Sequence, residues 1–109
     1  MLNPDQWTTI RSLVAWLDRE NGRSDAEITL RLLKITEEAG EAAAAWIGVQ
    51  GQNPRKGVTH IHPDVQDELC DVILTAAVAL ASIVGNPQDV LDAKLRKVAD
   101  RAAALEVGA

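Results

Sequence analysis

Residues Glu37–Glu41 read EEAGE, and residues Asp67–Asp71 read DELCD. Within each stretch, two carboxylates are three residues apart, a spacing that on a helix places both side chains on one face, one turn apart. The four residues concerned are Glu38, Glu41, Glu68 and Asp71. Each stretch therefore predicts a helix that carries a pair of carboxylates on one side.

A break rich in Gly and Pro separates the two stretches and predicts that their helices form an antiparallel hairpin. We expect the first of these helices to end near Ile47 and the second to begin near Pro63. At about 1.5 Å of rise per residue, Glu41 then lies roughly 9 Å before the break and Glu68 roughly 7.5 Å after it. The hairpin should therefore bring the two pairs nearly level.

Four carboxylates in one small volume repel one another, so some of them would stay protonated at neutral pH unless a cation joined them. Oxygen ligands suit Mg²⁺ or Mn²⁺, whereas zinc sites usually include His or Cys. We therefore predict a Mg²⁺ site, with Mn²⁺ as a possible substitute. A solvated acidic face is the alternative; it is the better interpretation of any single pair and the weaker one of two matched pairs. The predicted metal ligands are Glu38, Glu41, Glu68 and Asp71.

The carboxylates of the first stretch lie at different angles to the apolar stripe of their helix. This stripe recurs at about 100° per residue. Its members are Ile28, Leu32, Ile35, Ala39, Ala42 and Trp46. Glu38 borders the stripe, Glu41 lies further round, and Glu37 is nearly opposite. We therefore expect Glu38 to reach the interior, Glu41 to lie at the mouth of the site, and Glu37 to be solvated or to support the ligands.

Length and composition indicate one folded domain, residues 1–109. Hydrophobic residues make up 47% of the chain, yet Phe and Tyr are absent, so the core must consist of Ala, Leu, Val, Ile and three Trp. Because Ala allows helices to approach closely, we expect an all-α fold resembling a four-helix bundle. The net charge of -5 argues against nucleic acid or an anionic membrane as the principal partner.

The single cysteine, Cys70, has no second thiol in the chain with which to form a disulfide. Its acidic neighbours disfavour a reactive thiolate, so we expect it to be a small buried side chain. The N-terminal residues show no basic segment followed by an apolar run and a cleavage site. A cytoplasmic protein is therefore expected.

Asn3 as an N-cap and Pro4 at the first helical position predict the start of the first helix, and Asn21 and Gly22 should end it. Trp7, on the apolar stripe of this helix, is expected in the core. Trp16 lies at the margin of the stripe, so packing and the stacking of a base both stay open for it. The residues Ser24 and Glu27 form a capping box that predicts the start of a second helix.

The third helix is small and apolar almost all round from Val72 to Val84. These residues are too few to span a bilayer, which takes about 20. One helix that needs cover on several sides, in so short a chain, predicts that a second subunit supplies part of the cover. We therefore expect a homodimer or homotetramer. The residues Asn86 and Pro87 predict the start of a fourth helix.

Basic residues occur in two places. Arg55 and Lys56 lie in a predicted loop from Gly48 to His62, which is longer than ordinary helix connections. Two interpretations of this loop stay open: it folds over a phosphate-bearing ligand, or it is a basic loop without a ligand. The fourth helix carries the basic residues Lys94, Arg96, Lys97 and Arg101. These residues are expected to bind phosphate only if that helix lies beside the carboxylates.

The paired motif of EEAGE and DELCD resembles the EExxE and ExxD signature of the MazG-like, all-α nucleoside triphosphate pyrophosphohydrolases. The resemblance extends from about Leu30 to Leu80 and is weaker in the last helix. It implies an oligomeric enzyme that uses Mg²⁺ to cleave a nucleoside triphosphate between the α and β phosphates, releasing the monophosphate and pyrophosphate. Removal of damaged nucleotides from the cellular pool is one role that fits this activity.

The resemblance also implies roles for single residues. Glu38, Glu41, Glu68 and Asp71 correspond to the metal ligands of the family, and Glu37 to the first Glu of its motif. Glu37 or Glu38 is expected to accept a proton from the attacking water. Lys94, Lys97 and Arg101 resemble positions of the last helix that contact phosphates. Two departures, Lys94 where the family often has Asn and Val98 where it has an aromatic residue, leave the sugar and base contacts undefined.

Two other functions compete with this prediction. A phosphoribosyl-ATP-type pyrophosphohydrolase would use the same carboxylates on a different substrate. A helical binding or regulatory module would keep the fold without turnover. A di-iron carboxylate protein is a weaker candidate, because the helical ExxH motifs of that class are absent and His60 and His62 lie in the predicted loop.

Overall fold

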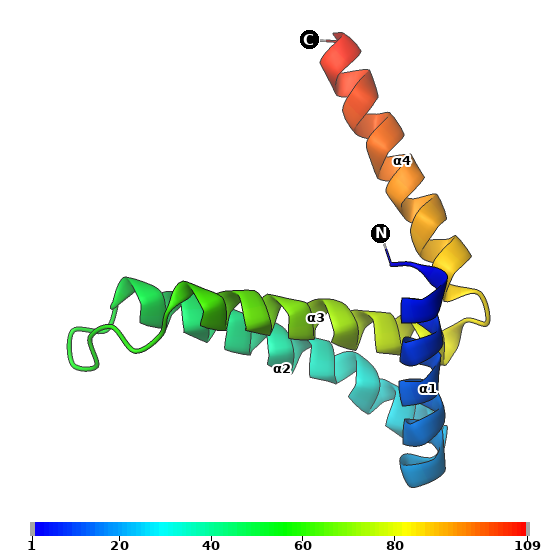
Figure 1. The fold of residues 1–109 in the computed structure, drawn as a ribbon, viewed down its shortest axis with the longest axis horizontal. Coiled ribbons are helices and arrows are strands. Elements are labelled where there is room, and N and C mark those ends of the chain that lie inside the picture. The colour runs from blue at the N-terminus through cyan, green and yellow to red at the C-terminus, as the bar shows by residue number, and fades with distance from the viewer. Residues whose placement is uncertain (1, 109) are drawn as a thin grey trace.

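The computed structural model describes residues 2–108, and within this range the chain is entirely helical apart from its connections. The four helices are α1 (Pro4–Asn21), α2 (Asp25–Gln50), α3 (His62–Ile83) and α4 (Pro87–Gly108). Figure 1 shows α2 and α3 side by side as a long antiparallel hairpin, with α1 crossing one end of it and α4 leading away. The expected all-α fold with four helices is therefore confirmed.

Local hydrogen bonds explain why α1 begins where the sequence predicts. The side chain of Asn3 accepts a hydrogen bond from the backbone N–H of Gln6 at 2.8 Å, and the side chain of Gln6 accepts one from the N–H of Asn3 at 2.8 Å. This reciprocal arrangement satisfies two backbone donors that a helix start leaves free. At the other end, Gly22 has a φ of 78°, a left-handed value that glycine adopts at little cost.

The core is small and lies where α1 crosses α3. Trp7 is 0% exposed, and it forms a buried cluster with Ile10 and Ala77. Partly buried apolar side chains surround this cluster: Leu2, Val78, Leu80, Ala81 and Leu91. The predicted core role of Trp7 is thus confirmed.

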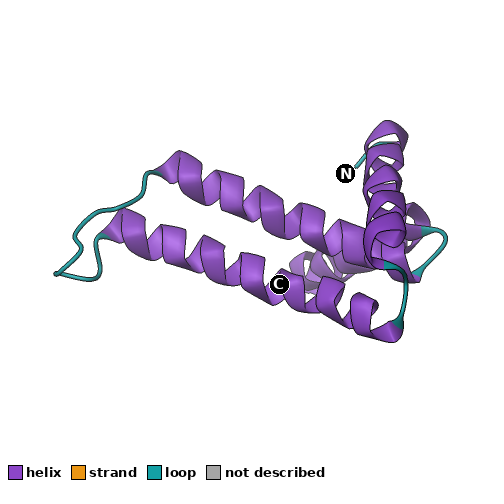
Figure 2. Ribbon diagram, turned by 90° about the horizontal axis from the view of Figure 1, so that it is seen from below, coloured by secondary structure: helices purple, strands orange, loops and turns teal. Residues whose placement is uncertain are grey.

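The hairpin is close-packed because small residues line its inner face. Ala42 and Ala45 of α2 are buried, and α2 and α3 run alongside each other over their length (Figure 2). The expected end of this helix near Ile47 was wrong, since α2 continues to Gln50. The connection between the two helices is correspondingly shorter than predicted, and α3 begins at His62.

Gly48 lies inside α2 for a packing reason rather than at a break. It is buried, and a Cβ at this position would clash with Nδ1 of His60 and with the hydroxyl of Thr59. The carbonyl of Gly48 also accepts a hydrogen bond from the N–H of Thr59 at 3.0 Å. The glycine therefore lets the connection fold back onto the end of α2.

A buried cation joins three helices at the opposite end of the hairpin. The side chain of Arg31 is only 4% exposed. Its guanidinium donates hydrogen bonds to the carboxylates of Glu27 at 2.7 Å and Asp18 at 3.0 Å, and to the hydroxyl of Ser82 at 3.1 Å. It also donates to the carbonyl of Gly22 at 3.0 Å. Because these partners belong to α1, α2, α3 and the α1–α2 connection, Arg31 fixes how α1 crosses the hairpin.

The third helix is less covered than its composition suggests. Ile73, Leu74 and Ile83 are exposed, as is Cys70, so the expectation that this cysteine is buried was wrong. In the part of the chain that the structure describes, none of the helices alone has the length and apolar character of a membrane span, and α3 and α4 reach them only together, as a pair bent by 118°.

Candidate metal centre

Three of the predicted ligands meet in the middle of the hairpin. Glu38 and Glu41 project from α2 and Glu68 from α3, and each offers a carboxylate oxygen such that all three oxygens lie within 4.8 Å of one another. The i, i+3 spacing brings the first two together, and the antiparallel pairing of the helices adds the third. The predicted level arrangement of the acidic residues is therefore present for these three side chains.

The two α2 carboxylates of the group differ in exposure in the order expected from their angles on the helix. The side chain of Glu38 is 12% exposed, whereas Glu41 is exposed at the surface. Glu68 is partly buried, and its Oε2 is shielded from solvent without a hydrogen-bond partner. A buried acceptor that lacks a donor is costly, so this oxygen is one that a cation would stabilise.

Electrostatic repulsion acts on the carboxyl of Glu41. Repulsion from Glu38 raises its pKa above the ordinary value, and loss of some hydration and repulsion from Glu68 raise it further. Like charges held this close favour a proton or a metal ion over three free charges. Full ionisation of all three carboxylates is therefore unfavourable without a positive charge beside them.

Lys34 is a neighbour of the cluster that the sequence reasoning missed. Its ammonium nitrogen lies 3.2 Å from a carboxylate oxygen of Glu38 and 3.2 Å from one of Glu37. These two carboxylates hold the pKa of Lys34 above its ordinary value. The spacing of three and four residues between Lys34 and the acidic pair is the signal that could have revealed it.

Two predicted residues stay outside the group of three. Glu37 is 62% exposed and pairs with Lys34, which matches the expectation that it is solvated or supporting. Asp71 follows Glu68 by one turn on α3 and is partly buried, but its oxygens are not among those that converge. The structure therefore assembles Glu38, Glu41 and Glu68, and leaves Asp71 beside them.

The five predicted phosphate-binding residues are all exposed and are not gathered around the carboxylates. Arg55 and Lys56 lie in the connection at the far end of the hairpin (Figure 1). The other three lie on α4, which leads away from the hairpin (Figure 1); they are Lys94, Lys97 and Arg101. Within one chain, Lys34 is thus the cation that contacts the carboxylate cluster.

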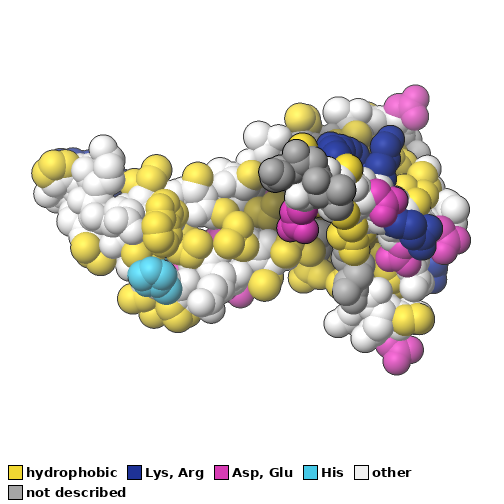
Figure 3. Space-filling view, turned by 90° about the horizontal axis from the view of Figure 1, so that it is seen from above, with side chains coloured by type: hydrophobic (Ala, Val, Ile, Leu, Met, Phe, Trp, Pro, Cys, Tyr) yellow, Lys and Arg dark blue, Asp and Glu magenta, His cyan; other side chains and the backbone are white. Residues whose placement is uncertain are grey.

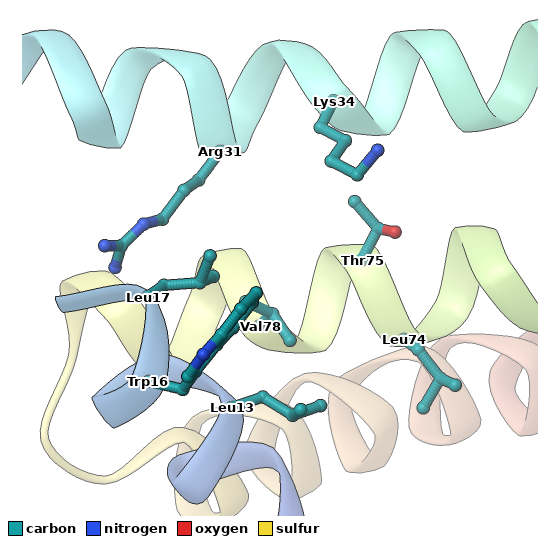
Figure 4. A pocket seen from close by; sticks show the side chains of 8 residues that line it. All are labelled: Leu13, Trp16, Leu17, Arg31, Lys34, Leu74, Thr75 and Val78. Carbon is teal, nitrogen blue, oxygen red and sulfur yellow. The ribbon is translucent and has the colours of Figure 1, made fainter. Parts of the chain in front are cut away.

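An apolar cavity of about 280 Å³ adjoins the cluster. Its lining comes from α1, α2 and α3: Leu13, Trp16, Leu17, Arg31, Lys34, Leu74, Thr75 and Val78. Figure 4 shows the ring of Trp16 on the α1 side of the cavity and the side chain of Lys34 descending from α2 toward Thr75. Because Lys34 lines this cavity and also binds Glu38, the cavity and the carboxylates are neighbours.

The chemistry of the residues fits a hard divalent cation. All three converging side chains offer oxygen, as Mg²⁺ and Mn²⁺ prefer, and the shielded Oε2 of Glu68 lacks a donor. Comparison with known proteins finds no matching family model, no matching curated protein and no matching solved structure.

Proposed function

We propose that this protein is a Mg²⁺-dependent pyrophosphohydrolase that cleaves nucleoside triphosphates between the α and β phosphates. The observation that supports the proposal is the convergence of Glu38, Glu41 and Glu68 from two helices at one level of the hairpin. The resemblance of EEAGE and DELCD to the MazG-like signature also supports the proposal, through the same carboxylates taken as a sequence motif. Mn²⁺ is expected to substitute for Mg²⁺.

In this proposal Glu38, Glu41 and Glu68 would hold the metal, and the bound ion would supply charge neutralisation and Lewis acidity toward the triphosphate. Glu38 is the proposed acceptor of the proton from the attacking water, since it is the most buried of the three and borders the cavity through Lys34. Lys34 limits the negative charge on Glu38 and Glu37 before the substrate arrives. Asp71, one turn from Glu68, is a proposed further ligand.

The base of the nucleotide is proposed to enter the cavity beside the carboxylates. The side chain of Trp16 is about half exposed, at 51%, and forms part of the cavity lining. An exposed indole on an apolar cavity offers a flat surface on which a base can stack. The adjacent position of Lys34 and Glu38 would place the phosphates of such a nucleotide near the carboxylates.

A pyrophosphate-release assay with Mg²⁺ or Mn²⁺ tests the proposal. The panel should contain canonical and damaged nucleoside triphosphates and a phosphoribosylated nucleotide, because the competing pyrophosphohydrolase reaction would act on the last of these. Glu38→Gln should abolish release. Asp67→Asn, which removes an exposed carboxylate outside the cluster, should leave it unchanged. Metal binding without hydrolysis of any member of the panel would favour a binding module instead.

A further inference from the structure

Lys34 lies between the apolar cavity and the carboxylate cluster. It lines the cavity together with Trp16 and Thr75. Its ammonium nitrogen lies 3.2 Å from Oε1 of Glu38 and 3.2 Å from Oε1 of Glu37. Figure 4 shows its side chain reaching from α2 toward Thr75. A nucleotide with its base in the cavity and its phosphates at the carboxylates would therefore pass directly beside this ammonium group.

The other cations of the chain are committed elsewhere or lie at the ends of the hairpin. Arg31, the second cation of the cavity lining, is only 4% exposed. Its guanidinium already donates hydrogen bonds to two carboxylates, a hydroxyl and a backbone carbonyl. On the face that Figure 3 shows, the Lys and Arg side chains gather toward the two ends of the hairpin, and the stretch between them shows none. Among the described residues, Lys34 is thus the cation that both lines the cavity and contacts the cluster.

The ammonium group of Lys34 and a divalent cation compete for the carboxylate of Glu38. Two positive charges on one carboxylate repel each other strongly at a separation of a few ångströms. Lys34 is free to move away, because its side chain is 55% exposed and its four-carbon stem is flexible. A triphosphate offers the displaced ammonium group a new partner, since lysine is a common ligand of phosphate.

We propose that Lys34 exchanges partners when the substrate binds. Its ammonium group leaves Glu38 for a phosphate oxygen of the nucleotide, and the carboxylate of Glu38 becomes available to the metal. This inference rests on the proposed function, because it takes a metal ion and a triphosphate as the ligands of the site. Without nucleotide, Lys34 opposes the metal; with nucleotide, it binds the phosphates. Metal and nucleotide therefore strengthen each other's binding.

Binding of Mn²⁺ alone to the full chain, measured by electron paramagnetic resonance, tests the first half of the exchange. Lys34→Gln removes the competing charge, so it should bind Mn²⁺ about 2- to 5-fold more tightly than wild type, as expected from the loss of an exposed ion pair. Lys34→Arg keeps the charge and should bind as wild type does. Arg11→Gln is a matched control, because it removes one positive charge from an exposed position of α1 outside the cavity lining.

Binding of phosphates at saturating Mg²⁺, measured by isothermal titration calorimetry, tests the second half. The two probes are inorganic triphosphate, which has no base, and α,β-methylene-ATP, in which the bond that the proposed enzyme cleaves is blocked. Lys34→Gln should bind both probes at least about 10-fold more weakly, because it loses a hydrogen bond between charged groups. Lys34→Arg should retain most of the affinity, and Arg11→Gln all of it.

The two measurements on Lys34→Gln should thus shift in opposite directions. Lys34→Met takes its place if the Gln variant loses helical circular dichroism. Unchanged or weaker binding of Mn²⁺, unchanged affinity for both probes, equal shifts in Arg11→Gln, or a wild-type chain that binds neither probe would overturn the exchange. Opposite shifts without pyrophosphate release from any nucleotide would refute the proposed hydrolase and leave the exchange standing. Release by the wild-type chain with no shift in Lys34→Gln would refute the exchange alone.

Discussion

The ammonium nitrogen of Lys34 lies 3.2 Å from Oε1 of Glu38, so one carboxylate of the cluster is already paired with a cation of the chain. Among the residues that the structure describes, Glu41 has no such partner, and it is repelled by Glu38 and Glu68. The charge of Glu38 is therefore balanced by Lys34, whereas the charge of Glu41 is not. A divalent cation would act chiefly on the unbalanced part.

The raised pKa of Glu41 predicts how stability depends on pH. Above the ordinary carboxyl pKa of 4.5, the folded chain retains a proton at Glu41 that the unfolded chain has lost. Since the folded state then binds more protons, the free energy of unfolding falls as the pH rises through the raised pKa. Urea unfolding in EDTA should therefore show Glu41→Gln gaining stability relative to wild type as the pH rises from about 4.5.

The same titration should respond to metal. With Mg²⁺ in excess, the ionised cluster is stabilised, and the advantage of Glu41→Gln should shrink or reverse. Asp18 provides an internal contrast at lower pH. Burial raises the pKa of the Asp18 carboxyl, but the hydrogen bonds and charges of Arg23 and Arg31 lower it by more, so the net pKa lies below its ordinary value. The contribution of Asp18 to the free energy of unfolding is therefore lost only as the pH falls below about 3.8. A Glu41→Gln difference that does not change with pH would contradict the proposed repulsion.

Trp16 should influence substrate affinity more than turnover. Loss of stacking on a base costs about 1 to 3 kcal/mol, so Trp16→Leu should raise KM for the nucleotide about 5- to 150-fold with a small change in kcat. Trp46→Leu is a matched control, because Trp46 is exposed to a similar degree but contacts His62 near the far end of the hairpin. Equal effects of the two substitutions on KM would place the base elsewhere.

Arg31 should contribute to the stability of the fold, because it joins α1, α2 and α3. Arg31→Ala leaves the carboxylates of Asp18 and Glu27 without their buried partner, and we expect a loss of about 2 to 4 kcal/mol in the free energy of unfolding. Arg11→Ala, on the exposed side of α1, should change it by less than about 0.5 kcal/mol. Chemical unfolding of both variants gives the comparison, and similar stabilities would show that the junction contributes little.

Two glycines of α2 should respond in opposite directions to the same substitution. Gly40 has open space where a Cβ would lie, so Gly40→Ala should stabilise the chain by about 0.5 to 1 kcal/mol. Gly48→Ala forces a methyl group against His60 and Thr59, and should destabilise it by about 1 to 3 kcal/mol. Thermal or urea unfolding of the pair decides, and a stabilising Gly48→Ala would mean that the connection yields without cost.

The starts of the helices could be predicted from the sequence, whereas the end of α2 could not. Helix starts depend on neighbouring residues, and the caps at Asn3 and Ser24 were identified correctly. The end of α2 was not, because Gly48 serves a contact with a residue of the connection rather than ending the helix. Similarly, Cys70 was expected to be buried because its acidic neighbours disfavour a reactive thiolate, but whether a helix face is covered depends on a neighbouring element that the local sequence does not specify.

The candidate site shows the same division between local and long-range information. Glu38 and Glu41 are three residues apart, and Glu41 and Glu68 lie at similar distances from the break between the helices. These two facts were sufficient to predict that the three side chains converge. The pairing of Lys34 was also local, although it was overlooked. The direction of α4 was not predictable, since it depends on the turn before Pro87 and not on the pattern of α4 itself. The basic residues of α4 were consequently assigned to a site that their own chain does not bring them to.

Direct binding of Mn²⁺ to the full chain, monitored by electron paramagnetic resonance, is the sharpest test of the proposed metal centre. Wild-type protein should show saturable binding, and Glu68→Gln should weaken it at least 10-fold, because it removes the charge at the shielded oxygen. Asp67→Asn, the exposed neighbour on α3, should bind as wild type does. Failure of the wild-type chain to bind Mn²⁺ saturably, or equal binding by Glu68→Gln, would contradict a metal site at these carboxylates.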